Sequence, residues 1–273
     1  MELALRFLRV SPWGTAVRRT CRKERSDMQH SHTEPDDRSV YEQIKELLVT
    51  YAFLPGDRLH VPELADQLRV SATPVREALN RFCAESLLTA VPHRGFFVKR
   101  LDQAEIADLF GMKYMMLDYA ASGTIAGLRL DDGERRALAT IAGLDKEDED
   151  LPERLRVYER YAVPMTLLIA SLSQNAALLE CLRNVLDRLH FVRLTEIAME
   201  DRAETILKEA AAISQGLLAG SEAAVKRGLE EQHLREQRML PELMKECVNR
   251  LYLRCRPAPQ SSERSARLVM VTA

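Results

Sequence analysis

The chain contains 273 residues, of which 46% are hydrophobic and 29% charged, and its formal net charge at pH 7 is −2. This composition is typical of a folded protein with room for two domains, and it excludes a chain that binds nucleic acid through an overall positive charge. The five cysteines are scattered without a CxxC pair, and no apolar run approaches the roughly 18–20 residues of a membrane helix, so we expect a cytoplasmic protein with reduced thiols and no membrane contact.

Residues 1–37 contain the Arg18-Arg19 pair but no apolar segment after it, so a secretion signal is not expected. Two interpretations of this segment remain open. It is either a disordered basic arm or sequence upstream of the true start, for which Met28 is a candidate. In both cases the folded chain begins near Arg38.

The pattern of residues 38–101 predicts a small domain that begins with three helices. The first begins near Ser39, where apolar side chains recur at helical spacing, and it ends at Leu54-Pro55-Gly56-Asp57. A second, short helix fits Val61 to Leu68, and a third runs from about Thr73 to Ser86. The spacing therefore predicts a compact three-helix unit.

A β-hairpin follows, with two β-type runs on either side of a turn at Pro92 to Gly95. Three helices and a hairpin in this order make a winged helix-turn-helix, in which the start of the third helix enters the major groove and the hairpin turn lies along the minor groove or its phosphates. The alternatives are a solvated arginine on the third helix and an ordinary surface turn. The predicted DNA-binding residues are Ser71, Ala72, Thr73 and Arg76 on the third helix, and His93, Arg94 and Gly95 in the turn.

Residues 102–253 predict an all-α domain without strands, so that the protein as a whole is mainly α. We interpret Met112, Met115 and Met116 as core packing, 145–150 as a solvated acidic loop, and 254–273 as a flexible tail. The expected helical segments are 103–128, 131–144, 151–173, 175–199, 201–219 and 221–253.

Several strings in the first domain resemble the GntR family of transcription regulators. The resemblance covers about residues 38–250 and is greatest to the FadR-like branch, whose C-terminal, FCD-type domain is an all-helical bundle. It implies a homodimer that binds a short palindromic operator in double-stranded DNA and responds to a small-molecule effector. The strings are Leu54-Pro55-Gly56-Asp57-Arg58-Leu59, Glu63-Leu64-Ala65, Ser71-Ala72-Thr73-Pro74-Val75-Arg76-Glu77-Ala78-Leu79 and Arg94-Gly95-Phe96-Phe97-Val98.

Two residues depart from the family pattern in the DNA-binding segment. Ala72 stands where many relatives have an arginine that reads guanine, and Arg69 stands where a turn glycine is usual. Loss of a bidentate arginine removes roughly 1–3 kcal/mol of base discrimination. We therefore expect an altered operator, or greater reliance on Arg76 and the hairpin turn.

The helical domain of this branch often holds a divalent metal through one Asp and three His, and the metal helps to bind a carboxylate effector. The corresponding positions here are Ala162, Thr166, Ala210 and Gln232, or His233 with a shift of one residue. A metal ion needs at least three converging ligands, and alanine offers none. We therefore expect that the metal site is lost and that no other cofactor replaces it.

Without the charge of a metal, a carboxylate or phosphate effector needs a fixed cation from the protein. Arginine is mostly a surface residue, so we expect only some of the available cations to face a cavity. The candidates are Lys113, Arg183, Arg188 and Arg193.

The sequence thus predicts a transcription regulator, with repression as the expected mode, whose operator affinity depends on a small, carboxylate-bearing metabolite. Two alternatives remain open. The helical domain either has lost sensing and serves only to dimerise, or carries an enzyme site. For an enzyme we find no GxSxG, HExxH or glycine-rich phosphate loop, so no catalytic residue is predicted.

Overall fold

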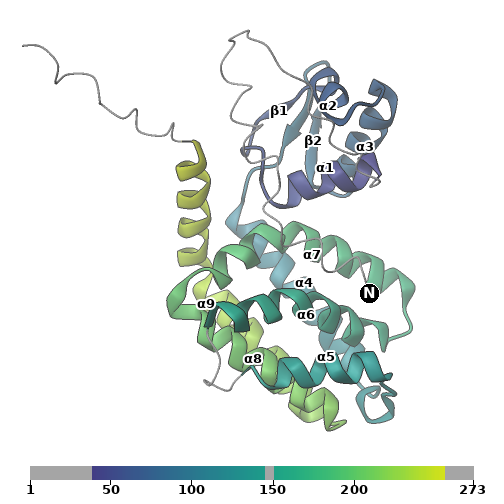
Figure 1. Ribbon diagram of the computed structural model, residues 1–273, viewed down its shortest axis with the longest axis vertical. Coiled ribbons are helices and arrows are strands. Elements are labelled where there is room, and N and C mark those ends of the chain that lie inside the picture. The colour runs from purple at the N-terminus through teal and green to yellow at the C-terminus, as the bar shows by residue number, and fades with distance from the viewer. Residues whose placement is uncertain (1–38, 145–150, 256–273) are drawn as a thin grey trace, which may run out of the picture.

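The protein is described from a computed structural model, which covers residues 39–144 and 151–255. The predicted N-terminal arm (1–37), the acidic run 145–150 and most of the predicted tail (254–273) lie outside the described residues. Within the described ranges a small domain sits on a larger helical bundle (Figure 1).

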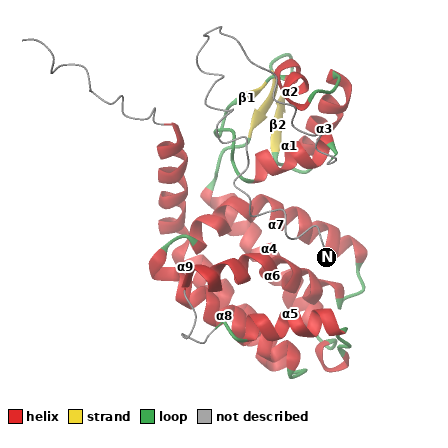
Figure 2. Cartoon of the chain, in the orientation of Figure 1, coloured by secondary structure: helices red, strands yellow, loops and turns green. Residues whose placement is uncertain are grey.

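The small domain is the predicted winged helix-turn-helix. Its helices are α1 (Val40–Val49), α2 (Val61–Leu68) and α3 (Ala72–Ala84), and its hairpin strands are β2 (Leu88–Val91) and β3 (Gly95–Val98). A short strand that we did not predict, β1 (Arg58–Leu59), pairs antiparallel with β3 to give the sheet order β1-β3-β2. All strands of the described chain lie in this domain (Figure 2).

Local signals explain where these helices begin and end. The Ser39 hydroxyl accepts the Glu42 N–H while the Glu42 carboxylate accepts the Ser39 N–H, which makes a capping box at the start of α1. At the end of α2, Arg69 adopts a left-handed conformation with φ 56°. Apolar faces of the three helices meet the sheet in one core, which includes Ile44, Leu64, Val75, Leu79, Phe82 and Val98.

The larger domain consists of six α-helices among the described residues and a 3-10 turn at Ile125–Gly127, which confirms the predicted all-helical class. Glycine allows the close α8–α9 contact, because a methyl group on Gly228 would lie 2.6 Å from Ile213 Cγ1. The helices are α4 (Gln103–Ala121), α5 (Asp132–Ala142), α6 (Leu151–Ser171), α7 (Ala176–Ile197), α8 (Glu200–Leu218) and α9 (Glu222–Cys255).

The prediction of a methionine core on α4 was wrong for two of three residues. Met112 is 37% exposed and Met115 is 62% exposed, whereas Met116 packs against the core. The reason is that α4 is apolar on more than one face, so the sequence alone did not identify which face packs against the bundle.

Helix α7 lies at the top of the helical bundle in Figure 1, directly below the small domain. Lys45 Nζ on α1 lies 2.5 Å from the Asp187 carboxylate on α7, and the Asn184 amide donates to the Glu85 carbonyl at the end of α3 over 2.8 Å. The Tyr51 ring packs against the Phe191 ring of α7, with 4.9 Å between the ring centres. These contacts connect the two domains directly through α7.

Candidate DNA-binding surface and effector cavity

The first turn of α3 presents the predicted recognition residues to solvent. Ser71 is the N-cap, with extended φ/ψ of −72° and 163°, and Ala72, Thr73 and Arg76 are exposed beside it. The opposite face of α3 is held in the core by Val75, Ala78, Leu79 and Phe82. This arrangement leaves the N-terminal backbone and the Arg76 guanidinium accessible, as groove binding requires.

The hairpin turn presents its predicted residues in a strained backbone conformation. His93 has φ 61° and Gly95 has φ 100°, values that glycine adopts readily and other residues rarely do. His93 and Arg94 are exposed, and the Arg94 Cζ lies 5.8 Å from the centre of the Phe97 ring. The turn therefore projects a polar and cationic tip that is anchored on strand β3.

The structure adds Arg58 to this surface. Arg58 pairs with Phe97 across the β1–β3 ladder and is exposed. Its side chain reaches toward the turn, because a methyl group on Gly95 would lie 3.4 Å from Arg58 Nε. Sequence reasoning missed this residue because a two-residue strand leaves no periodicity to detect.

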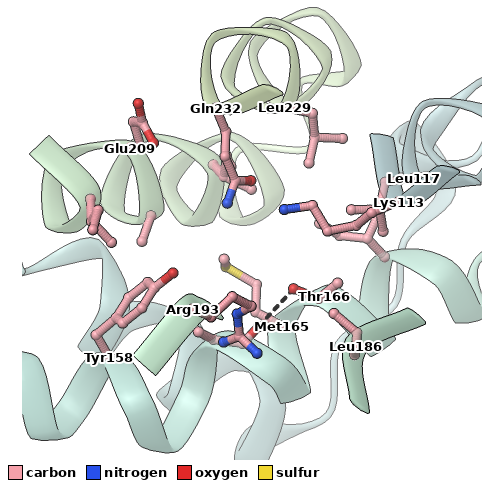
Figure 3. A pocket seen from close by; sticks show the side chains of 15 residues that line it. Lys113, Leu117, Tyr158, Met165, Thr166, Leu186, Arg193, Glu209, Leu229 and Gln232 are labelled. Carbon is pink, nitrogen blue, oxygen red and sulfur yellow. Dashed lines mark hydrogen bonds between the residues drawn. The ribbon is translucent and has the colours of Figure 1, made fainter. Parts of the chain in front are cut away.

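The helical bundle encloses a small polar cavity of about 30 Å³ between α4, α6, α7, α8 and α9. The Gln232 amide points into it from above and the Lys113 ammonium from the right, and the Met165 side chain lies below them (Figure 3). Burial raises the pKa of Tyr158, so this phenol in the lining stays protonated and able to donate a hydrogen bond.

The four positions that correspond to the family's metal ligands all line this cavity, namely Ala162, Thr166, Ala210 and Gln232. Their side chains do not fit a divalent ion, because the two alanines offer only methyl groups and the Thr166 hydroxyl donates to the Ala162 carbonyl over 2.8 Å. His233 lies outside the lining and stacks on Tyr114, with 4.6 Å between ring centres. No cluster of three or more His, Cys, Asp or Glu with metal-binding geometry occurs among the described residues.

The four candidate effector-binding cations lie in different places. Lys113 and Arg193 line the cavity, whereas Arg183 lines a second, apolar pocket. Arg188 forms an ion pair with Glu105 near the junction of the domains. The structure therefore places Lys113 and Arg193 in the lining of one cavity and the other two candidates elsewhere.

Buried charges surround the cavity. Lys113 forms an ion pair with Glu236, and both side chains are buried, at 6% and 2% exposure. Arg235 contacts the carboxylates of Glu196 and Glu209. Because Lys113 already has a carboxylate partner, Arg193 is the cavity cation better placed to meet an added anion.

Comparisons with known proteins decide the family. Residues 37–98 match the sequence model of a protein family described as "Bacterial regulatory proteins, gntR family". The Nta operon transcriptional regulator of Aminobacter aminovorans is 34% identical over 149 residues, which cover 54% of this chain and 68% of that protein. The chain belongs to the GntR family. McbR of Escherichia coli, an HTH-type transcriptional regulator, is 28% identical over 46% of this chain and 61% of its own length.

Solved structures of GntR-type regulators share the fold. A transcriptional regulator from Rhodococcus sp. RHA1 aligns with a TM-score of 0.59 and 19% identity, over 76% of this chain and 96% of its own. McbR/YncC of E. coli aligns with a TM-score of 0.58 and 22% identity, over 75% and 96% of the two chains. The predicted family and fold class are thereby confirmed, with the helical C-terminal domain fitting the FadR-like branch.

The GntR relatives are named as transcriptional regulators, and this chain is a transcription regulator with a DNA-binding domain of that family. Throughout residues 39–144 and 151–255, no helix combines the length and apolar character needed to cross a membrane.

Proposed function

We propose that this GntR-family regulator is a cytoplasmic repressor without catalytic activity, and that it binds a short palindromic operator as a homodimer. The observation that carries the DNA-binding part is the exposed start of α3, where Ser71, Thr73 and Arg76 stand clear of a buried apolar face. Phosphate contacts from the hairpin turn position such a helix, and base contacts from the helix supply specificity.

The proposed effector is a small, carboxylate-bearing metabolite bound in the bundle cavity without a metal. Arg193 supports this proposal because a guanidinium can pair with a carboxylate through two parallel hydrogen bonds and thus replaces the charge of an ion. The Tyr158 phenol and the Gln232 amide in the lining offer further donors.

Helix α7 is the proposed link between effector and DNA. Leu186 and Arg193 on this helix line the cavity, while Asn184 and Asp187 on the same helix hold the small domain. A ligand that shifts α7 therefore changes the placement of the DNA-binding domain. Such a ligand controls operator affinity only through a difference in contacts between two arrangements.

The DNA-binding part is tested with purified protein and DNA from its own gene neighbourhood, titrated against salt by fluorescence anisotropy. We expect selective binding that Arg76→Ala loses and that Arg135→Ala, an exposed arginine on α5, retains. Wild-type protein that binds no DNA at low salt, where phosphate contacts are strongest, contradicts the regulator.

The link through α7 is tested by breaking the Lys45–Asp187 ion pair. We expect Asp187→Asn to retain effector binding but to reduce the effect of the effector on operator affinity. The exchanged pair Lys45→Asp with Asp187→Lys restores part of that effect. An unchanged response in Asp187→Asn eliminates this ion pair from the link.

A second candidate function is a regulator whose bundle dimerises without sensing. The small cavity, about 30 Å³, favours it, because no metabolite fits such a space while every side chain stays in place. Thermal shift separates the two candidates, since a ligand that binds only the folded state raises the melting temperature with the logarithm of its concentration. If carboxylates of every chain length leave the melting temperature unchanged, the non-sensing form is favoured.

A further inference from the structure

The polar cavity is too small for the effector that its side chains would bind. Its volume of about 30 Å³ holds roughly two water molecules. Drug-sized ligands occupy pockets of about 300–1,000 Å³. A metabolite with its carboxylate at Arg193 therefore needs additional space, which the movement of a lining side chain can provide.

A second pocket of about 310 Å³ lies beside the cavity, between α5, α6 and α7. It is lined mainly by apolar side chains from the three helices, among them Leu138, Tyr161, Leu168 and Leu179. Such a lining accepts alkyl or aryl groups, because burial of each methylene stabilises a complex by about 0.8 kcal/mol.

Met165 is the one residue, within the described chain, that lines both spaces. Its side chain is buried and projects into the middle of the polar cavity (Figure 3). Methionine has three rotatable side-chain bonds and no branching, so it changes conformation at low cost. The boundary between the polar cavity and the apolar pocket thus includes a side chain that can move.

Pro164, next to Met165, weakens α6 at this point. It lies inside the helix and lines the apolar pocket. A proline has no N–H to donate to the carbonyl one turn earlier, here that of Arg160, and its ring disfavours a straight helix. The helix can therefore adjust locally at the boundary between the two spaces.

We propose that Met165 is a displaceable partition and that the effector is an amphipathic carboxylate, with its anionic group at Arg193 and an apolar tail in the pocket beside Pro164. This inference rests on the proposed effector site. It assigns the ligand class: an acid with an extended alkyl or aryl tail, rather than a short, polar acid.

The test measures binding of straight-chain carboxylates, from acetate to decanoate, to the full chain by calorimetry. Affinity is expected to rise by up to about fourfold per added methylene, which is 0.8 kcal/mol converted to a binding ratio, until the tail fills the pocket. Alkylammonium ions of the same lengths serve as controls for unspecific binding of the tail, because Arg193 repels their charge.

Three variants locate the two ends of the ligand. Arg193→Gln should abolish binding at every chain length. Met165→Ala should raise affinity for long carboxylates and leave acetate unchanged. Because Met165→Ala leaves a cavity in the core, a second variant is needed. Ala137→Phe fills the apolar pocket from α5 and should weaken the binding of long carboxylates but not of short ones.

The outcomes separate this inference from the proposed function. If short carboxylates bind at Arg193 and release DNA but longer tails add no affinity, the partition is refuted while the proposed effector site stands. If long carboxylates bind equally well to Ala137→Phe and to wild type, the tail does not enter this pocket and the inference also falls. If no carboxylate of any length binds, the proposed effector site itself is refuted.

Discussion

Replacement of Arg58 by alanine tests whether the cation beside the hairpin turn contacts a DNA phosphate. The guanidinium lies against Gly95 and is exposed, so its removal costs the fold little, within about 0.5 kcal/mol as for other surface substitutions. The expected loss is therefore in DNA affinity and not in stability.

The magnitude follows from counterion release. Each phosphate contact contributes about −0.9 to the slope of the logarithm of the binding constant against the logarithm of salt concentration. In the proposed homodimer Arg58→Ala removes two such contacts, so the slope becomes less steep by about 1.8. The ratio of wild-type to variant affinity should then shrink about 12-fold between roughly 50 and 200 mM salt.

Fluorescence anisotropy with one operator fragment across that salt range measures both slopes. Arg100→Ala is the matched control, because Arg100 is also exposed and packs against a glycine, Gly56, but follows β3 at the end of the sheet away from the turn. Arg58→Lys should keep most of the slope, since it keeps the charge. If the salt dependence of Arg58→Ala has the same slope as that of wild type and of Arg100→Ala, the phosphate contact is refuted.

Three further predictions concern stability. Lys113→Met leaves the buried Glu236 carboxylate without its cation and should lower the free energy of unfolding by about 3–5 kcal/mol in chemical denaturation. The double variant Lys113→Met with Glu236→Met should recover most of this loss. A single variant whose stability lies within about 1 kcal/mol of wild type contradicts the prediction. Arg69→Gly should stabilise the fold by about 0.5–1 kcal/mol, because glycine tolerates the φ of 56°, and a lower melting temperature refutes it. Burial, and secondarily Arg193, lower the pKa of His190 to about 4, so the unfolded chain takes up a proton near pH 6.5 and the folded one does not. Stability should fall from about pH 6.5 towards pH 4, less steeply in His190→Gln, and equal pH profiles in urea unfolding count against this assignment.

The local order of elements could be predicted from the sequence. The second helix was predicted at Val61 to Leu68 and is observed there, because Pro62 suits its first turn and apolar residues repeat at helical spacing up to Leu68. The third helix was predicted from about Thr73 and is observed from Ala72, because a proline is tolerated in its first turn and apolar residues recur at helical spacing up to Phe82. Such signals depend only on residues that are close together in the sequence.

What only the tertiary structure decided depends on segments that are distant in the chain. Arg188 and Arg193 look alike in sequence, yet one contacts Glu105 on α4 and the other lines a cavity shared by five helices. Arg58 gained its place beside Gly95 only through the pairing of β1 with β3. The exposure of Met115 likewise depended on which side of α4 faces the bundle. Periodicity identifies an apolar face, but packing between helices determines what that face contacts, and a site built from several helices exists only after they pack.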